Sequence, residues 1–235
     1  MSAHHLALRF LPIAPITKHR MVERHDWAAE RLTQLEKTSW RQLRGRRSDE
    51  WLAGRLAAKD AVIALHGAAS TGAAFWPEIT TSVSDSDHGR PLTCAPYHIS
   101  ISHSHGLAVA AASTRPVGVD IEVHERRWPL NVLELITHVT EHLPRSVRLL
   151  PAMVWSCAEA VLKQRGCGIR RGIDVVHLTR FTDEGVFEWT EHPPREGRGV
   201  DAPLCGFAKN LGSHSLALIW EQEPVKQHND ERAKS

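Results

Sequence analysis

The sequence predicts an α+β protein made of two similar halves, because a helix followed by a strand occurs twice in the same order. The first helix is expected at residues 51–59, with Leu52 and Leu56 on one stripe and with Arg55 and Lys59 forming a basic face. The second is expected at residues 155–163. In both segments a Trp is followed four residues later by a charged residue, and four residues after that by Lys. This shared spacing favours an internal duplication.

A pair of similar segments downstream supports the duplication. Residues 104–109 read Ser-His-Gly-Leu-Ala-Val and residues 213–218 read Ser-His-Ser-Leu-Ala-Leu, and both are expected to be strands. We therefore expect the halves to divide near Gly118, with an N-terminal half at 1–118 and a C-terminal half at 119–235.

The remaining segments contain strand and loop signals. Residues 6–16 are apolar but interrupted by Arg and Pro, which favours a strand over a leader peptide. Residues 80–87 are rich in Ser, Thr and Asp and are expected to form a loop, as are residues 193–199. The polar residues 221–235 are expected to be a frayed tail.

Composition excludes several classes of protein. The 235 residues are 42% hydrophobic and 24% charged, as in an ordinary globular protein, and the net charge is only +2. Such a charge does not call for nucleic acid or an anionic membrane as a partner. Since no apolar run has the length of a membrane span, we expect a cytoplasmic protein without a membrane segment. We also expect it to be a monomer.

The cysteines and histidines show no metal-site spacing. The four cysteines are far apart and form no CxxC pair, which suits reduced thiols. The sixteen histidines include no HExxH and no Cys/His ligand pattern. Spacing along the chain therefore does not indicate a zinc site.

A pair of carboxylates at residues 117–122, Val-Gly-Val-Asp-Ile-Glu, is the strongest chemical signal. Apolar runs flank residues 114–116, which predicts a β-hairpin. Side chains alternate along a strand, so Asp120 and Glu122 must share one face. Neighbouring carboxylates suit Mg²⁺ bound together with phosphate oxygens, although charge on an edge strand is the alternative explanation.

Two further motifs could bind phosphate. Ser102, His103 and Ser104 precede an apolar run, where hydroxyl, amide and imidazole groups could converge on an anion, although an ordinary Ser/His turn explains them equally well. The run Gly-Arg-Pro at 89–91 presents the guanidinium of Arg90 on a turn.

The second helix carries polar residues on one stripe. Ser156, Glu159 and Lys163 lie three and four positions apart, so they should project together. A solvated Glu/Lys salt bridge is the alternative explanation.

Taken in order, these motifs resemble the phosphopantetheinyl transferases of the larger, surfactin-synthetase-activating type, in particular the branch of enterobactin synthetase component D. The matching elements are Arg47 with the first helix, then 89–91, Ser102 with His103, 117–122, and 155–163. They cover about half of the chain, and the ordered set is far more specific than any one motif.

The resemblance implies a fold and a reaction. Members are pseudodimers of two α+β halves, each an antiparallel sheet packed with a long helix, with the active site in the cleft between the halves. They move the phosphopantetheine arm of coenzyme A to a serine of an apo acyl or peptidyl carrier protein and release 3′,5′-ADP. The branch suggests siderophore or other secondary-metabolite synthesis.

The resemblance also implies roles for single residues. Mg²⁺ or Mn²⁺ would be held by Asp120, Glu122 and Glu159. Glu159 would act as the general base, and Lys163 would assist catalysis. Coenzyme A, as co-substrate, would be bound by six side chains: Arg47, Arg55, Arg90, Ser102, His103 and Lys163.

Two positions depart from the family pattern. Ala158 stands where many members have Lys, which puts in doubt a mechanism that needs that cation, and Ser100 stands where many have Asn. Two alternatives stay open: Ala158 is the only support for the first, and the second would use the same carboxylates. One is a degenerate protein that binds coenzyme A or a carrier without transfer, and the other is a Mg²⁺-dependent phosphohydrolase.

Overall fold

The computed structural model describes residues 6–13, 30–66, 77–84, 89–167, 172–192 and 204–221. Four α-helices and ten strands are present in these ranges, together with the 3₁₀ turn η2 (Ile173–Val175). The helices are α3 (Gln34–Arg41), α4 (Gly45–His66), α5 (Leu130–Thr140) and α6 (Pro151–Arg165). The strands are β1 (Leu6–Pro12), β2 (Ile79–Thr81), β3 (Pro91–Thr93), β4 (His98–Ser104), β5 (Leu107–Ser113), β6 (Val117–Val123), β7 (Val176–Phe181), β8 (Val186–Glu191), β9 (Leu204–Leu211) and β10 (His214–Trp220). The predicted α+β class is confirmed.

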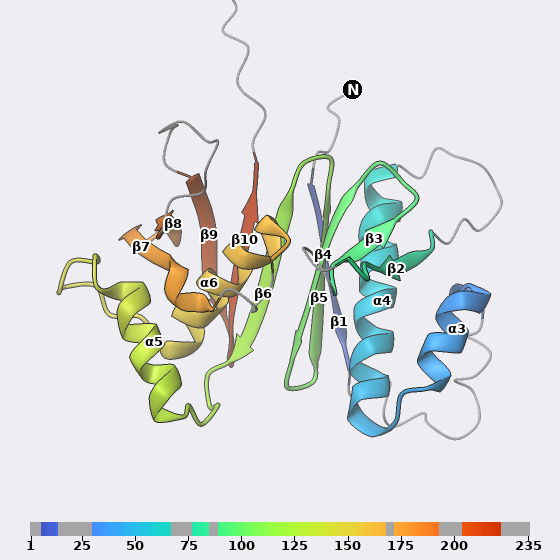
Figure 1. Cartoon of the computed structure of the whole chain (residues 1–235), viewed down its shortest axis with the longest axis horizontal. Helices are drawn as coiled ribbons and strands as arrows, with labels where there is room; N and C mark the ends of the chain where they lie inside the picture. Colours follow the sequence, from blue (N-terminus) through green and yellow to red (C-terminus); the bar gives the residue numbers. More distant parts are fainter. Residues whose placement is uncertain are drawn as a thin grey trace, which may run out of the picture.

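Two antiparallel sheets form the body of the protein. One has the order β1-β5-β4 and the other the order β6-β10-β9-β8-β7, while β2 and β3 pair separately. Figure 1 shows the sheets next to each other, with α4 against the first and with α5 and α6 against the second. Each sheet is therefore packed with one long helix.

Strand β5 is buried on both faces because its alternating side chains are small and apolar. Ala110 and Ala112 join the core under α4. Val109 and Ala111 instead pack with residues of β6 and β10 in the second sheet. Because side chains alternate along β5, one face of the first sheet packs against α4 and the other face packs against the second sheet.

Strand β6 divides its side chains in the same way. Val119 and Ile121 join the apolar contact with β5. A Cβ on Gly118 would lie 1.9 Å from the carbonyl oxygen of Ala160, which shows how closely the other face of β6 approaches α6. The even-numbered residues of β6 thus face the second helix.

The predicted hairpin around residues 114–116 is wrong. Strands β5 and β6 belong to different sheets, since β5 already pairs with β1 and β4 on its two edges while β6 pairs with β10. The tight hairpin lies one connection earlier, between β4 and β5, where His105 and Gly106 have φ of 38° and 88°. Positive φ at both central residues is typical of a type I′ turn.

This hairpin also corrects the boundaries of two predicted segments. Ser102 and His103 lie inside β4 and not in a turn, and the segment 104–109 spans the turn itself. The segment 213–218 coincides with a turn residue followed by β10.

Both predicted helices are confirmed and are longer than their motifs, but the basic face expected on the first is wrong. Lys59 has no exposed surface, and its Nζ lies 2.8 Å from Glu36 Oε2 and donates to the carbonyl of Pro77 at 2.6 Å. Arg55 is also buried. Since α4 is covered by β1, β4, β5 and β2, charges on this face need protein partners.

The remaining segment predictions have mixed outcomes. The N-terminal strand is confirmed as β1, and its last predicted residues, 14–16, lie outside the described residues. Part of the predicted loop 80–87 is strand β2, and 85–88 lie outside. The loop 193–199 and the tail from 222 onward are likewise outside. In the described ranges, no helix is long and apolar enough to cross a membrane. The half boundaries 1–118 and 119–235 stay a prediction.

Candidate active site between β4, β6 and α6

The two carboxylates of β6 lie on the face that meets α6, as strand alternation predicts. Asp120 is 5% exposed and Glu122 is 9% exposed, so both are buried in the protein. Burial of two neighbouring anions is unfavourable unless cations or hydrogen-bond donors surround them.

Asp120 receives two strong donors on one oxygen. Its Oδ1 accepts hydrogen bonds from Ser102 Oγ and from Lys163 Nζ, both at 2.6 Å. The same Nζ donates to the carbonyl of Val119 at 3.3 Å. The other oxygen, Oδ2, is buried without a hydrogen-bond partner. Asp120 therefore joins β4, β6 and α6 and keeps one oxygen available for a further ligand.

Glu122 is held by Ser104 and by Arg126, a residue that the sequence analysis did not single out. Its Oε1 accepts from Ser104 Oγ at 2.9 Å, and its Oε2 lies 2.9 Å from Arg126 Nη1. The guanidinium of Arg126 also stacks over the rings of Trp128 and Trp155. Ser104 lies two residues beyond Ser102 and so shares its face of β4.

Glu159 completes the group from the helix side. Its side chain is buried, and Oε1 has no hydrogen-bond partner. Burial raises the pKa of Glu159 to about 7; Lys163 opposes this change, and the charges of Asp120 and Glu122 add to it. The predicted stripe on α6 is confirmed at this point, since Glu159 and Lys163 both face the carboxylates of β6.

The charges in this site leave room for a cation. Three carboxylates, those of Asp120, Glu122 and Glu159, are opposed by the two cations Lys163 and Arg126. Two buried oxygens, Asp120 Oδ2 and Glu159 Oε1, have no partner. Hard oxygen donors with uncompensated charge suit Mg²⁺, so the residues fit the predicted ion.

The donor atoms of Asp120, Glu122 and Glu159, however, do not all lie within 4.8 Å of one another. Among the described residues, the group that meets this criterion is elsewhere, at Glu141, His142 and His177. At the β6 site, Lys163 and Arg126 already occupy one oxygen of Asp120 and one of Glu122.

His103 forms the exposed edge of the site. Its Nδ1 lies 3.8 Å from Glu50 Oε2 on α4, a residue that the sequence analysis did not identify. Burial lowers the pKa of His103; Glu50 and Asp120 act against this change, and Lys163 adds to it. The imidazole therefore interacts with charges on both α4 and β6. Because its pKa is lowered, the ring is predominantly neutral at pH 7.

The three predicted arginines occupy different surroundings. Arg90 Nη2 lies 3.0 Å from His98 Nδ1, and a Cβ on Gly166 would lie 3.2 Å from Arg90 Nη1, so this guanidinium lies against the C-terminal end of α6. Arg47 is exposed on the first turn of α4. Both cations could meet a phosphate from solvent.

Arg55 makes its contacts with neighbouring groups of the protein itself. It donates to the carbonyl of Thr80 at 3.3 Å and lies over the ring of Trp51. Burial lowers its pKa to about 10, and the charge of Glu36 opposes this change. Its contacts anchor β2 to α4, and its role toward coenzyme A stays a prediction.

Ala158 and Ser100, the two departures from the family pattern, both have defined environments. Ala158 has no exposed surface and packs in the core of the second half. Ser100 accepts a hydrogen bond from the backbone N–H of Val119 at 2.9 Å. Ser100 thus contributes to the junction between β4 and β6 rather than to a loop.

Comparison with known proteins identifies the family. No family model matches the chain. The holo-[acyl-carrier-protein] synthase of Halalkalibacterium halodurans is 34% identical over 95 residues, which are 38% of this chain and 78% of that protein. A holo-(acyl-carrier-protein) synthase from Bacillus anthracis, solved in complex with CoA (3′,5′-ADP), is 28% identical with a TM-score of 0.37, and the match covers 46% of this chain and 92% of that chain. The identity to a curated relative over most of that relative's length shows that the chain belongs to the phosphopantetheinyl transferases.

Proposed function

We propose that this protein transfers the phosphopantetheine arm of coenzyme A to a serine of an apo acyl or peptidyl carrier protein, with Mg²⁺. The observation that carries the proposal is the buried cluster in which Asp120 pairs with Lys163 beside Glu159, with two carboxylate oxygens unpartnered. A degenerate binding protein would not need to maintain buried charges with this cost.

The reaction forms one bond and breaks another. The carrier serine oxygen attacks the phosphorus that bears the pantetheine arm, and the bond from that phosphorus to the bridging pyrophosphate oxygen breaks. The leaving group is 3′,5′-ADP, and the serine proton passes to a base. Because the attacked phosphorus carries negative charge, neutralisation is the main requirement.

The unpartnered oxygens of Asp120 and Glu159, together with Glu122, are the groups that would hold Mg²⁺. When bound there, the ion supplies positive charge beside the pyrophosphate oxygens. Lys163, which lies 2.6 Å from Asp120, adds a second positive charge and donates hydrogen bonds to the phosphate. Ser102 and His103 present a hydroxyl and an imidazole from β4 on the other side.

Glu159 is the base in this proposal. A carboxyl group whose pKa is about 7 can accept a proton near neutral pH and still favour transfer from the serine hydroxyl. Lys163, one helical turn away, orients the leaving phosphate. Because Ala158 packs in the core, position 158 supplies no cation to the base. Lys163 is the cation on the same helix that acts on Glu159.

The proposal also covers the two-half architecture, the arginines that bind the nucleotide, the pathway and the location in the cell. Two sheet-and-helix units in the same chain order support a pseudodimer with the site in the cleft between the halves. Arg47, Arg55 and Arg90 are proposed to bind the nucleotide phosphates, and the pathway is proposed to be secondary-metabolite or siderophore synthesis, in the cytoplasm.

The test incubates the protein with coenzyme A, Mg²⁺ and a panel of purified apo carrier proteins and weighs each carrier by mass spectrometry. A gain equal to one phosphopantetheine group, with an equivalent amount of 3′,5′-ADP, is the expected result. Coenzyme A binding without any mass gain on the panel would support the degenerate binding protein instead. Hydrolysis of coenzyme A in the absence of a carrier would support the phosphohydrolase.

A further inference from the structure

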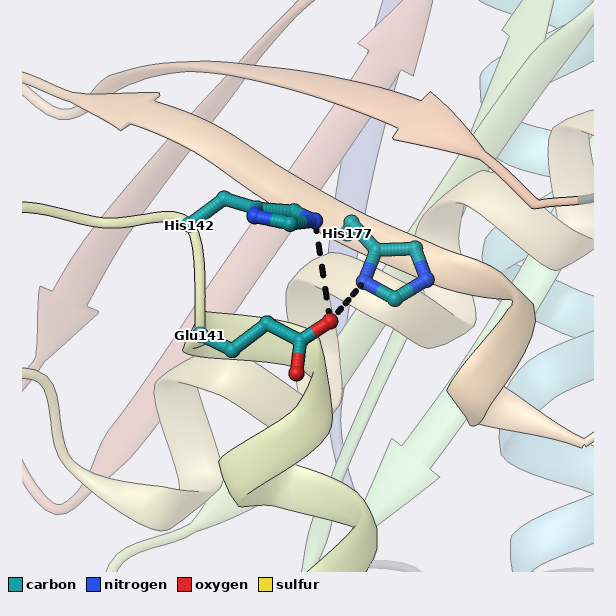
Figure 2. Close-up of side chains that lie close together, drawn as sticks. All are labelled: Glu141, His142 and His177. Atoms are coloured by element: carbon teal, nitrogen blue, oxygen red, sulfur yellow. Dashed lines mark ion pairs between the residues drawn. The ribbon is translucent and has the colours of Figure 1, made fainter.

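A second group of ligand-type side chains lies far from the carboxylates of β6, where α5 meets β7. Glu141 is the C-cap residue that follows α5, His142 is next in the chain, and His177 lies in β7. One donor atom from each lies within 4.8 Å of the other two. Figure 2 shows one nitrogen of each imidazole ring close to the same carboxylate oxygen of Glu141.

The distances in this cluster suit a shared cation better than direct hydrogen bonds. Glu141 Oε1 lies 3.3 Å from His177 Nδ1 and 3.6 Å from His142 Nε2. Charge-assisted hydrogen bonds are shorter, at about 2.7 to 2.9 Å. By contrast, two ligands each about 2.1 Å from a tetrahedral ion lie about 3.4 Å apart. Both distances in the cluster are close to that value.

An unpartnered nitrogen supports this interpretation. His177 Nδ1 is buried and has no hydrogen-bond partner, although the Glu141 carboxylate lies 3.3 Å away. The side chains of Glu141 and His142 are 44% and 55% exposed, so an ion can enter from solvent. A buried ring nitrogen without a partner, beside ligand-type groups that are open to solvent, is the arrangement expected of a metal site with a water position.

We propose that Glu141, His142 and His177 bind one divalent transition-metal ion of the zinc type, with water as the fourth ligand. Two imidazoles and one carboxylate are a donor set that Zn²⁺ favours and that Mg²⁺ does not. The site is thus chemically distinct from the oxygen cluster of Asp120. Because His142 and His177 come from different elements, the ion acts as a clip between α5 and β7.

The clip has a structural consequence for the neighbouring surface. Glu141 also lines a pocket of about 330 Å³ together with Thr137, Arg145 and Arg148. An ion bound at Glu141 therefore restrains one wall of this pocket. Metal binding is expected to stabilise the fold, since an ion that binds only the native state shifts unfolding by mass action.

Zinc titration of the protein, freed of metal by chelation and kept with reduced thiols, tests the proposal. We expect calorimetry to show a site for one Zn²⁺ that excess Mg²⁺ does not displace. His177→Ala, His142→Ala and Glu141→Gln should each weaken that site by about 100-fold or more, since losing a group that only hydrogen-bonds to a ligand already weakens metal binding by about 10- to 100-fold. Co²⁺ used as a probe should give the absorption bands of a tetrahedral site in the wild type and lose them in these variants.

Two controls separate this site from others. His138→Ala changes an exposed imidazole on the same helix, 3.7 Å from the other oxygen of Glu141, and should change Zn²⁺ affinity by no more than about twofold. Asp120→Asn should keep the Zn²⁺ site intact. Zinc affinity that survives in both the Glu141→Gln protein and the doubly substituted His142→Ala/His177→Ala protein, or no Zn²⁺ binding at all, would overturn the proposal.

Discussion

At the scale of single residues, ligand binding at the site depends on which carboxylate oxygens already accept hydrogen bonds. Asp120 Oδ1 has two donors at 2.6 Å, whereas Oδ2 has none. Glu159 Oε1 is also unpartnered. Buried oxygens without partners cost free energy, so their retention is best explained by a ligand that arrives during function.

Substitution of Asp120 by Asn tests this explanation. The change keeps the volume of the side chain but removes the charge, and transfer to the carrier should fall by at least about 100-fold at saturating Mg²⁺. The rate of carrier mass gain is the measurement. Asp183→Asn, at an exposed turn between β7 and β8, is the control and should transfer normally. Near-normal transfer by the Asp120 variant would show that the metal assignment is wrong.

Glu159 should also make the metal-free fold sensitive to pH. Because its pKa is raised to about 7 in the folded state, its proton stabilises the fold fully below the unfolded value of 4.5, and this contribution is lost as the pH rises through about 7. The loss is of the order of 3 kcal/mol. Urea unfolding in the presence of a chelator, across this pH range, measures it.

Glu159→Gln should flatten this part of the pH profile, because the amide does not titrate. Glu134→Gln, on the exposed face of α5, should keep the slope of the wild type. Equal slopes for the wild type and the Glu159 variant would mean that Glu159 does not titrate in this range.

At the scale of elements, the site depends on how closely β6 approaches α6. A Cβ on Gly118 would lie 1.9 Å from the Ala160 carbonyl oxygen and 2.7 Å from the Gln164 backbone nitrogen. These are backbone atoms, which cannot rotate away. The short approach is what brings Lys163 to Asp120.

Gly118→Ala should therefore destabilise the protein by about 3 kcal/mol, because the strand and helix must separate. Denaturant unfolding measures the change. Gly212→Ala is the matched control: no atom lies within 4 Å of its added Cβ, and the positive φ of 59° should cost about 1 kcal/mol. A smaller loss at Gly118 than at Gly212 would contradict the close contact.

At the scale of the whole molecule, the two sheets are joined by a row of serines on β4: Ser100, Ser102 and Ser104. Both β4 and β6 lie at the ends of their sheets in the strand order. The hydroxyl groups of the serine row accept hydrogen bonds from the backbone N–H groups of β6, at residues 119, 121 and 123. The serine side chains thus pair with backbone N–H groups at the edge of β6 that would otherwise have no hydrogen-bond partner.

Ser100→Ala tests the serine row away from the carboxylates, since Ser100 bonds only with the backbone of Val119 among the contacts described. The loss leaves a buried N–H without a partner and should lower the free energy of unfolding by about 2 kcal/mol. Ser39→Ala, an exposed serine of α3, should change it by less than about 0.5 kcal/mol. Equal effects of the two substitutions would show that the serine row does not join the halves.

Much of the site could be predicted from local pattern. Strand alternation placed Asp120 and Glu122 on one face, and helical spacing placed Glu159 and Lys163 on one stripe, because both periodicities are properties of the backbone. Partners from other elements could not be predicted in this way. Glu50, Arg126 and the Glu36 partner of Lys59 come into contact only after the helices and sheets pack.

The α+β class, the two long helices and the shared faces of the carboxylates and of the Glu/Lys stripe could be predicted from local pattern, because each depends on neighbours within a few residues. Three features became known from the folded chain alone: β5 and β6 belong to different sheets, Lys59 is buried, and Glu141, His142 and His177 lie together. These features depend on contacts between residues far apart in the chain, where hydrogen-bond pairing and burial are settled by the whole fold.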